Sequence, residues 1–346
     1  MGMDNTTATG PPGDNKARIL TVALLVLYCI ICVLGTVGNG LVIYVTGFRM
    51  KKTINSVWFL NLAIADFLFT FFMIFPTVSL SKDHRWPFGS IMCKLNAFIS
   101  VVNMFASVYF LTGISLDRCL STWVVAWARN KRTVSKIQLA SAFIWGVAML
   151  CSTPFTVYRK VLPYGGHLVC AFNPTEYPRW SLGVFRFSAG FFVPFVIIFF
   201  CHVAIYRRVG RLHRTKKRRC NRIIVTVILA FFLCWFPLNV IQLVELSSGT
   251  SDSLRLWGAL AVALSYFNSC LNPILYVFMC EDFQKKLRQS IYVVLEAAFA
   301  DEHMSFASSR SLSSPLQFMS RKSESAETEE SAVRAGTGGT TAGSMK

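Results

Sequence analysis

Charged residues are scarce in this chain, and acidic residues are the scarcest. Only 15% of its 346 residues are charged, and Asp and Glu together number 17 against 35 Lys and Arg. Soluble domains are about 25% charged, so this composition argues against a soluble protein. A Gly-rich phosphate loop and a nucleophile elbow are both lacking, and the histidines are too scattered for a metal site. The sequence therefore predicts no enzyme, no metal centre and no tightly bound cofactor; the histidines are His84, His167, His202, His213 and His303.

Long apolar runs occupy most of the chain. Hydrophobic residues make up 53% of it. A segment of about 20 apolar residues crosses the hydrocarbon core of a bilayer, and it must satisfy its own backbone hydrogen bonds there. We therefore expect an all-α membrane protein, a seven-transmembrane helix bundle in the lipid bilayer. Its apolar runs lie near residues 19–47, 55–80, 94–116, 138–158, 182–206, 223–246 and 254–279.

The net charge of +18 is distributed unevenly along the chain. Basic residues cluster between the first and second runs, the third and fourth, the fifth and sixth, and after the seventh. Connections rich in Lys and Arg stay in the cytosol, which puts the N-terminus outside the cell. This pattern predicts a multi-pass plasma-membrane protein and argues against nucleic-acid binding.

Three regions follow from this topology. We expect an extracellular tail over residues 1–18, a bundle over 19–292 that ends in a short amphipathic eighth helix, and a disordered cytoplasmic tail over 293–346. Asn5 is a glycosylation acceptor if the N-terminus is outside, whereas the myristoylation pattern at Gly2 requires a cytosolic end. The serines of the tail are either phosphorylation sites or part of a plain spacer.

Cys93 and Cys170 are the only two of 11 cysteines that fall on the predicted outer side. Disulfides persist in oxidising compartments, so this pair predicts a bridge from the third run to the loop after the fourth. Chance placement of two cysteines is the alternative. In the same loop, Gly165-Gly166 predicts a hairpin turn before Cys170.

Polar residues inside the apolar runs point to a solvated interior. Asn96, Ser100, Asn103 and Ser107 form a stripe on the third run, so that helix is surrounded by others. Asp66 lies near the middle of the second run, where it either has a role with water or a cation or is a protonated structural residue. A second stripe of Asn268, Asn272 and Tyr276 lies on the seventh run. Arg186, one turn inside the fifth run, either snorkels to the surface or faces a watery cavity.

The motifs taken together resemble the rhodopsin-like (class A) G-protein-coupled receptors over residues 19–292. Within that class the chain is similar to the chemoattractant receptors for chemerin, formyl peptides and complement anaphylatoxins. The class motifs are Gly38-Asn39, Leu62-Ala63-Ile64-Ala65-Asp66, Cys93, Asp117-Arg118-Cys119, Trp145, Cys170, Pro194, Cys234-Trp235-Phe236-Pro237 and Asn272-Pro273-Ile274-Leu275-Tyr276, and the chemoattractant group adds His84-Arg85-Trp86-Pro87-Phe88-Gly89 and Tyr266-Phe267-Asn268-Ser269-Cys270.

The resemblance implies roles for individual residues. Asp117 and Arg118 hold the inactive state and then meet a heterotrimeric G protein of the inhibitory class, and arrestin binds the phosphorylated tail. Ligand contacts are expected at Arg186, Trp235 and Glu245. The activation switch comprises Trp235, Pro237, Asn272, Pro273 and Tyr276, and an allosteric sodium and water site comprises Asp66, Asn103, Ser107, Asn268 and Asn272.

The sequence leaves several functions open. One is a signalling receptor for a chemoattractant peptide or protein in chemotaxis or inflammation, which the intact Asp117-Arg118-Cys119 favours. Another is a scavenging or decoy receptor, favoured by His202 and Val125 at positions where relatives usually have Tyr and often have Pro. A receptor for an acidic lipid mediator is the third.

Overall fold

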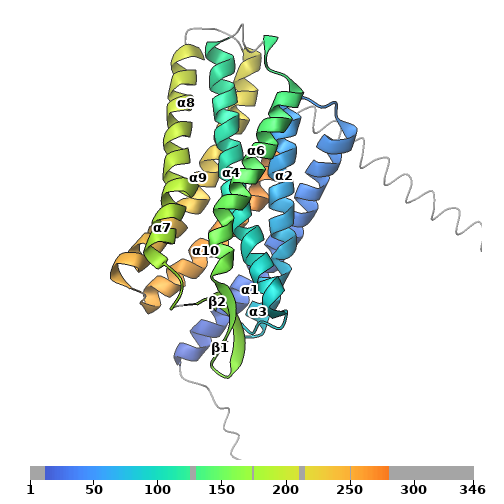
Figure 1. Ribbon diagram of the computed structural model, residues 1–346. Coiled ribbons are helices and arrows are strands. Elements are labelled where there is room, and N and C mark those ends of the chain that lie inside the picture. Colours follow the sequence, from blue (N-terminus) through green and yellow to red (C-terminus); the bar gives the residue numbers. More distant parts are fainter. Residues whose placement is uncertain (1–11, 125–129, 174, 210–214, 250, 280–346) are drawn as a thin grey trace, which may run out of the picture. The chain divides into compact units, whose positions relative to one another are not determined.

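The computed structural model describes residues 12–124, 130–173, 175–209, 215–249 and 251–279, which lie in one compact unit. Within these ranges seven helical spans are long and apolar enough to cross a membrane, which confirms the expected bundle. Figure 1 shows them side by side, with a small hairpin at one end. In chain order the elements are α1 (Pro12–Tyr44), η1 (Val45–Arg49), α2 (Ile54–Phe72), α3 (Ile74–Ser81), α4 (Gly89–Trp123), α6 (Val134–Val157), β1 (Arg159–Tyr164), β2 (His167–Phe172), α7 (Arg179–Phe187), η2 (Ser188–Phe192), α8 (Val193–Val209), α9 (Thr215–Ser248) and α10 (Asp252–Met279).

Prolines explain where the spans deviate from straight α-helix. The second span runs from Ile54 to Ser81 but divides at Met73 into α2 and α3. A proline ring clashes with the carbonyl four residues earlier, and for Pro76 that residue is Phe72, the last of α2. In the fifth span the π-helical turn η2 lies just before Pro194, in the region where this proline removes a backbone bond.

The hairpin closes one end of the bundle. β1 and β2 pair antiparallel, with Val161 opposite Cys170 and Tyr164 opposite His167. The two residues between the strands, Gly165 and Gly166, have φ of +55° and +79°. Two residues with positive φ make the tight turn whose twist matches the strands, and glycine adopts it without a steric cost. The predicted hairpin is confirmed.

The packed core is built around α4, which contacts α2, α6 and α8. Its side chains Phe105, Phe110 and Leu111 are at most 2% exposed and pack with residues of the neighbouring spans. Large apolar side chains on the outer faces remain exposed, as lipid-facing surfaces require. Examples of these exposed side chains are Val33, Leu139, Phe143, Leu150 and Leu233.

Some predictions fall outside the described residues. These are glycosylation at Asn5, Val125 of the second inner loop, the eighth helix and the phosphorylated tail. Tyr276 lies in α10, but its side chain is outside the description as well.

Candidate functional site

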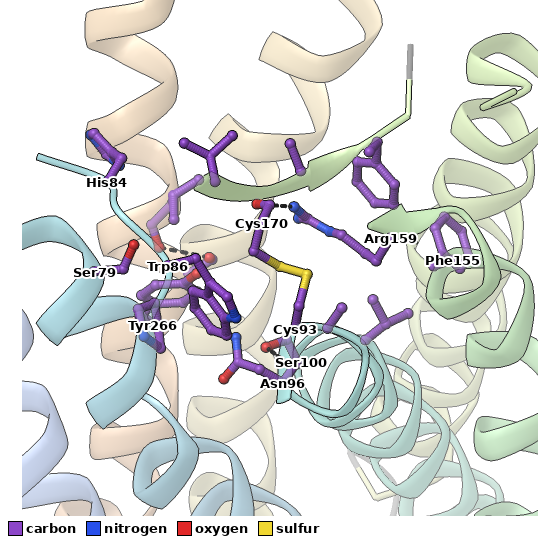
Figure 2. Close-up of a pocket in the computed structure, with 18 of the residues that line it drawn as sticks. Ser79, His84, Trp86, Cys93, Asn96, Ser100, Phe155, Arg159, Cys170 and Tyr266 are labelled. Carbon is purple, nitrogen blue, oxygen red and sulfur yellow. Dashed lines mark hydrogen bonds between the residues drawn. A yellow bond between two sulfur atoms is a disulfide. The ribbon is translucent and has the colours of Figure 1, made fainter. Parts of the chain in front are cut away.

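A disulfide fastens the hairpin to the bundle. Cys93 in the second turn of α4 is bonded to Cys170 of β2, with their Cα atoms 5.6 Å apart. Figure 2 shows this bridge between the strand and the helix. The backbone N–H of Trp86 donates to the carbonyl of Leu168 at 2.8 Å, so the loop before α4 also holds β2. The hairpin is therefore fixed from two sides.

A large cavity lies between the hairpin and the helices of the bundle. Its volume is about 740 Å³, which is within the range of sites for small molecules or peptide ends. The hairpin, α4, α9 and α10 all contribute to its wall. Among its lining residues are Asn96, Ser100, Phe155, Arg159, Phe172, Arg186, Trp235, Gln242 and Tyr266.

Arg159 is one of two arginines that line the cavity. Its Nη1 donates to the carbonyl of Cys170 at 3.1 Å, and its guanidinium carbon lies 4.0 Å from the centre of the Phe172 ring. Phe172 in turn stacks on Tyr177 at 4.2 Å. The Nε atom of Arg159 is buried and has no hydrogen-bond partner among the described residues. Burial lowers the pKa of Arg159, because the charged guanidinium loses water, yet an arginine stays protonated in proteins.

Arg186 is the second arginine, and it faces the cavity rather than the headgroups. Its Nε donates to the sulfur of Met104 on α4 at 3.3 Å. This settles the sequence alternatives in favour of the interior position. In the described part of the chain, neither arginine forms an ion pair with an Asp or Glu. Asp83 is the one acidic residue among those that line the cavity, and it is exposed at the outer loop.

The other two expected ligand residues differ in position. Trp235 lines the cavity; it is 5% exposed, and its indole N–H is buried with no partner among the described groups. Glu245, ten residues and nearly three turns further along α9, is not among the lining residues. The carboxylate of Glu245 lies beside Gly258 of α10: a Cβ atom placed on Gly258 would be 3.9 Å from Oε1 of Glu245.

A polar cluster surrounds Asp66 in the middle of the bundle. Asp66 is fully buried; it accepts from Ser269 Oγ at 2.7 Å and from Asn272 Nδ2 at 2.6 Å. The amide of Asn103 lies 3.2 Å from Asp66 Oδ1, and Ser107 Oγ lies 3.3 Å from that amide. The side chains of Ser269, Asn272 and Asn103 thus converge on one buried carboxyl group.

Sequence reasoning named Asn268 for this cluster and missed Ser269. Asn268 is buried, but no hydrogen bond joins it to Asp66 among the described side chains. A carboxylate together with hydroxyl and amide oxygens is the chemistry that hard cations prefer, so the residues present fit a sodium ion.

Asn39 connects this cluster to α1. Pro273 has no N–H, so it cannot bond to the Ser269 carbonyl four residues earlier. Asn39 Nδ2 donates to that carbonyl at 2.9 Å in its place. Gly38 makes the approach possible, because an added Cβ would come within 3.1 Å of Pro273. The Gly-Asn motif of the first span therefore supplies the hydrogen-bond donor that Pro273 cannot provide in the seventh span.

The charged residues at the other end of α4 have partners on α2 and before α6. Asp117 accepts from Arg132 at 2.7 Å (Nε to Oδ1) and 2.5 Å (Nη2 to Oδ2), a bidentate ion pair. Arg118 donates to the side-chain oxygen of Asn55 in the first turn of α2. His202 of α8 lies 3.5 Å from Ser115, one turn earlier on α4. Sequence reasoning assigned no role to Arg132 or Asn55.

Comparisons with known proteins agree with this architecture. The family model described as 7 transmembrane receptor (rhodopsin family) matches residues 38–276. Chemerin-like receptor 1 of Homo sapiens is 40% identical over 318 residues, which cover 85% of this chain and 84% of that protein. The C3a anaphylatoxin chemotactic receptor of Danio rerio is 39% identical over 292 residues, covering 84% and 80%. Formyl peptide receptor 2 of Mus musculus is 35% identical over 307 residues, covering 83% and 88%.

The chain therefore belongs to the rhodopsin family of seven-transmembrane receptors. Within this family it is a G-protein-coupled receptor of the chemoattractant group. As such it is a receptor and not an enzyme, and it is a multi-pass protein of the plasma membrane.

Proposed function

We propose that this receptor recognises the free carboxylate of a chemoattractant peptide or protein and signals through inhibitory-class G proteins. The observation that carries the proposal is the pair of arginines, Arg159 and Arg186, which line one cavity and have no acidic partner among the described residues. Two desolvated cations favour an anion, and a guanidinium presents a planar fork that fits a carboxylate. The C-terminal end of a peptide supplies such a group.

The relatives suggest which ligands to try first. Their names refer to chemerin and to the C3a anaphylatoxin, so C-terminal peptides of both are the first agonists to screen for G-protein activation. An acidic lipid mediator carries the same carboxylate and belongs in the same screen. The N-terminus lies outside the cell in this proposal, because the inner connections carry the basic residues.

The decisive comparison uses each active peptide as its free acid and as its C-terminal amide. Arg186→Ala is expected to weaken binding of the free acid by about 2–5 kcal/mol, since one partner of a desolvated charge pair is lost. Arg186→Lys recovers part of this loss, because the bidentate geometry is absent. Arg179→Ala removes an exposed arginine at the start of α7 and is the matched control. Equal effects of amidation on the parent and on Arg186→Ala would show that the carboxylate is read elsewhere.

A decoy receptor is the second candidate, and the residue that favours it is His202. His202 lies in the fifth span at a position where relatives usually have a tyrosine. Its ring contacts Ser115 in the inner half of α4. A ligand that is internalised without stimulating nucleotide exchange on any inhibitory-class G protein would support the decoy function. Exchange that is abolished by Arg118→Ala would exclude it.

The cluster around Asp66 is proposed to bind sodium as an allosteric ion. Support comes from the buried carboxyl group of Asp66 and the neighbouring hydroxyls of Ser269 and Ser107, with the side-chain amide of Asn103 beside them. An ion bound in preference to the inactive state opposes agonist binding by linkage. Sodium dependence of agonist affinity is the corresponding measurement.

A further inference from the structure

A second cavity lies at the end of the bundle opposite to the hairpin. Its volume is about 310 Å³, and it is bounded by η1, the loop at Lys52, the first two turns of α2 and the first half of α6. The wall mixes apolar and polar groups. Leu60, Ala142 and Trp145 supply apolar surface, while Lys52 and Gln138 are exposed residues of the same lining.

The polar groups of this cavity differ in whether they have free donors. The hydroxyls of Thr46 and Ser141 donate to carbonyls of their own helices at 2.7 Å and 2.8 Å, and Trp145 donates to Asn61 Oδ1 at 2.8 Å. Their hydrogens are therefore committed. The side chains of Lys52 and Gln138 form no hydrogen bond or ion pair with any other described residue. The ammonium of Lys52 and the amide of Gln138 are thus left to bind an external acceptor.

The surroundings of the cavity determine the kind of acceptor. Arg49 and Lys51 precede Lys52, and Lys131 lies just before α6, so this rim is basic. In the proposed topology it adjoins the cytosolic leaflet, which carries the anionic phospholipids of the membrane. Basic pockets between helices at this depth bind phospholipid headgroups. We propose that the cavity is a binding site for one anionic phospholipid.

The ligand fits the two parts of the cavity. Its phosphate accepts hydrogen bonds from Lys52 and Gln138, and the first part of its acyl chain packs on Leu60, Ala142 and Trp145. An exposed lysine alone attracts an anionic membrane weakly and without a defined place. The concave apolar wall beside Lys52 is what distinguishes a site from a charged surface, since it buries chain methylenes as well.

The test measures lipid retained by the purified full-length receptor. Receptor is reconstituted in nanodiscs that contain phosphatidylserine and phosphatidylcholine with the same acyl chains, and native mass spectrometry counts the lipids still bound after release. Both leaflets of a nanodisc are alike, so the result does not depend on the proposed topology, ligand or signalling. We expect one retained lipid per receptor, with phosphatidylserine preferred.

Three variants separate the contributions. Lys52→Gln should reduce the preference for phosphatidylserine about fivefold, the effect of one basic residue at an anionic surface. Ala142→Leu fills the cavity without altering charge and should lower retention of both lipids. Lys136→Gln removes an equally exposed charge outside the cavity lining and should leave retention unchanged. Thermal unfolding midpoints equal to the parent's establish that the variants are folded.

The proposal is overturned by any of three results. Equal losses in Lys52→Gln and Lys136→Gln would mean diffuse attraction to the surface. Full retention in Ala142→Leu would mean that the cavity is not used. Displacement of the lipid by soluble glycerophosphoserine at the same concentration would mean that the site reads the headgroup alone and not a membrane lipid.

Discussion

The ion pair between Asp117 and Arg132 allows a quantitative prediction. The side chain of Asp117 is 5% exposed and that of Arg132 is 17% exposed. Exposed pairs contribute about 0–1 kcal/mol, whereas breaking a fully buried pair costs about 3–5 kcal/mol. This bidentate but partly exposed pair lies between these limits, so Arg132→Gln should cost about 2 kcal/mol because it leaves the carboxylate without its cation. For a chain of 346 residues that loss lowers the Tm by about 3 °C.

A double-mutant cycle tests the assignment. The Tm of detergent-solubilised receptor is measured for the parent, Arg132→Gln, Asp117→Asn and the double variant. Because both single changes remove the same interaction, the double variant should lose less than the sum of the two. Lys131→Gln, which removes the neighbouring exposed charge, is the control and should shift the Tm little. Additive losses, or an Arg132→Gln shift no larger than that of Lys131→Gln, would refute the reasoning.

Three further predictions concern other parts of the bundle. Asn39→Leu removes the donor to the Ser269 carbonyl and should cost about 1–3 kcal/mol, seen as a lower Tm; an unchanged Tm would mean that the carbonyl is satisfied otherwise. Cys93→Ala detaches the hairpin and should abolish agonist binding or surface expression, and wild-type binding at a wild-type surface level would contradict the role given to the bridge. Added sodium should weaken agonist binding in the parent and have no effect in Asp66→Asn; equal sensitivity in both would eliminate the sodium site.

The spans, the hairpin and the bridge could be predicted because each depends on local chemistry. Apolar length alone defines a helix that crosses the bilayer. Gly165-Gly166 predicts a turn at its own position, because glycine tolerates the positive φ that a tight turn requires. The division at Met73 was missed in the sequence, although Pro76 indicates it once the clash with the carbonyl of Phe72 is considered.

The partners of Asp66 could not be predicted in full. Residues three or four apart lie on the same face of a helix. Either Asn268 or Ser269 can therefore lie on the face of α10 that carries Asn272. Periodicity along α10 favoured the first pairing, and the structure has the second. The rotation of α10 that decides between them depends on its packing against α1, where Gly38 meets Pro273. That contact is between residues far apart in the chain.

Arg159, Arg132 and Asn55 were missed for a related reason. Each is an ordinary polar residue at the end of an element, and nothing near it in the chain reveals its partner. Arg159 becomes notable only because the disulfide brings Cys170, the acceptor of its Nη1, over the cavity. Arg132 becomes notable only because the start of α6 comes beside the end of α4. Tertiary placement therefore carries information that residue type and spacing do not.

The burial of the spans indicates which helix is held most firmly in the bundle. In the apolar stretch of α4, 61% of residues are buried, against 44% for α9 and 11% for α6. Any displacement of α4 would disturb its packing on α2, α6 and α8 at once. In α9, Pro237 interrupts the backbone bonds just beyond Trp235, which lines the large cavity under the hairpin. α4 is therefore the span held most firmly by its neighbours, whereas Pro237 leaves α9 with a weakened helix turn beside Trp235.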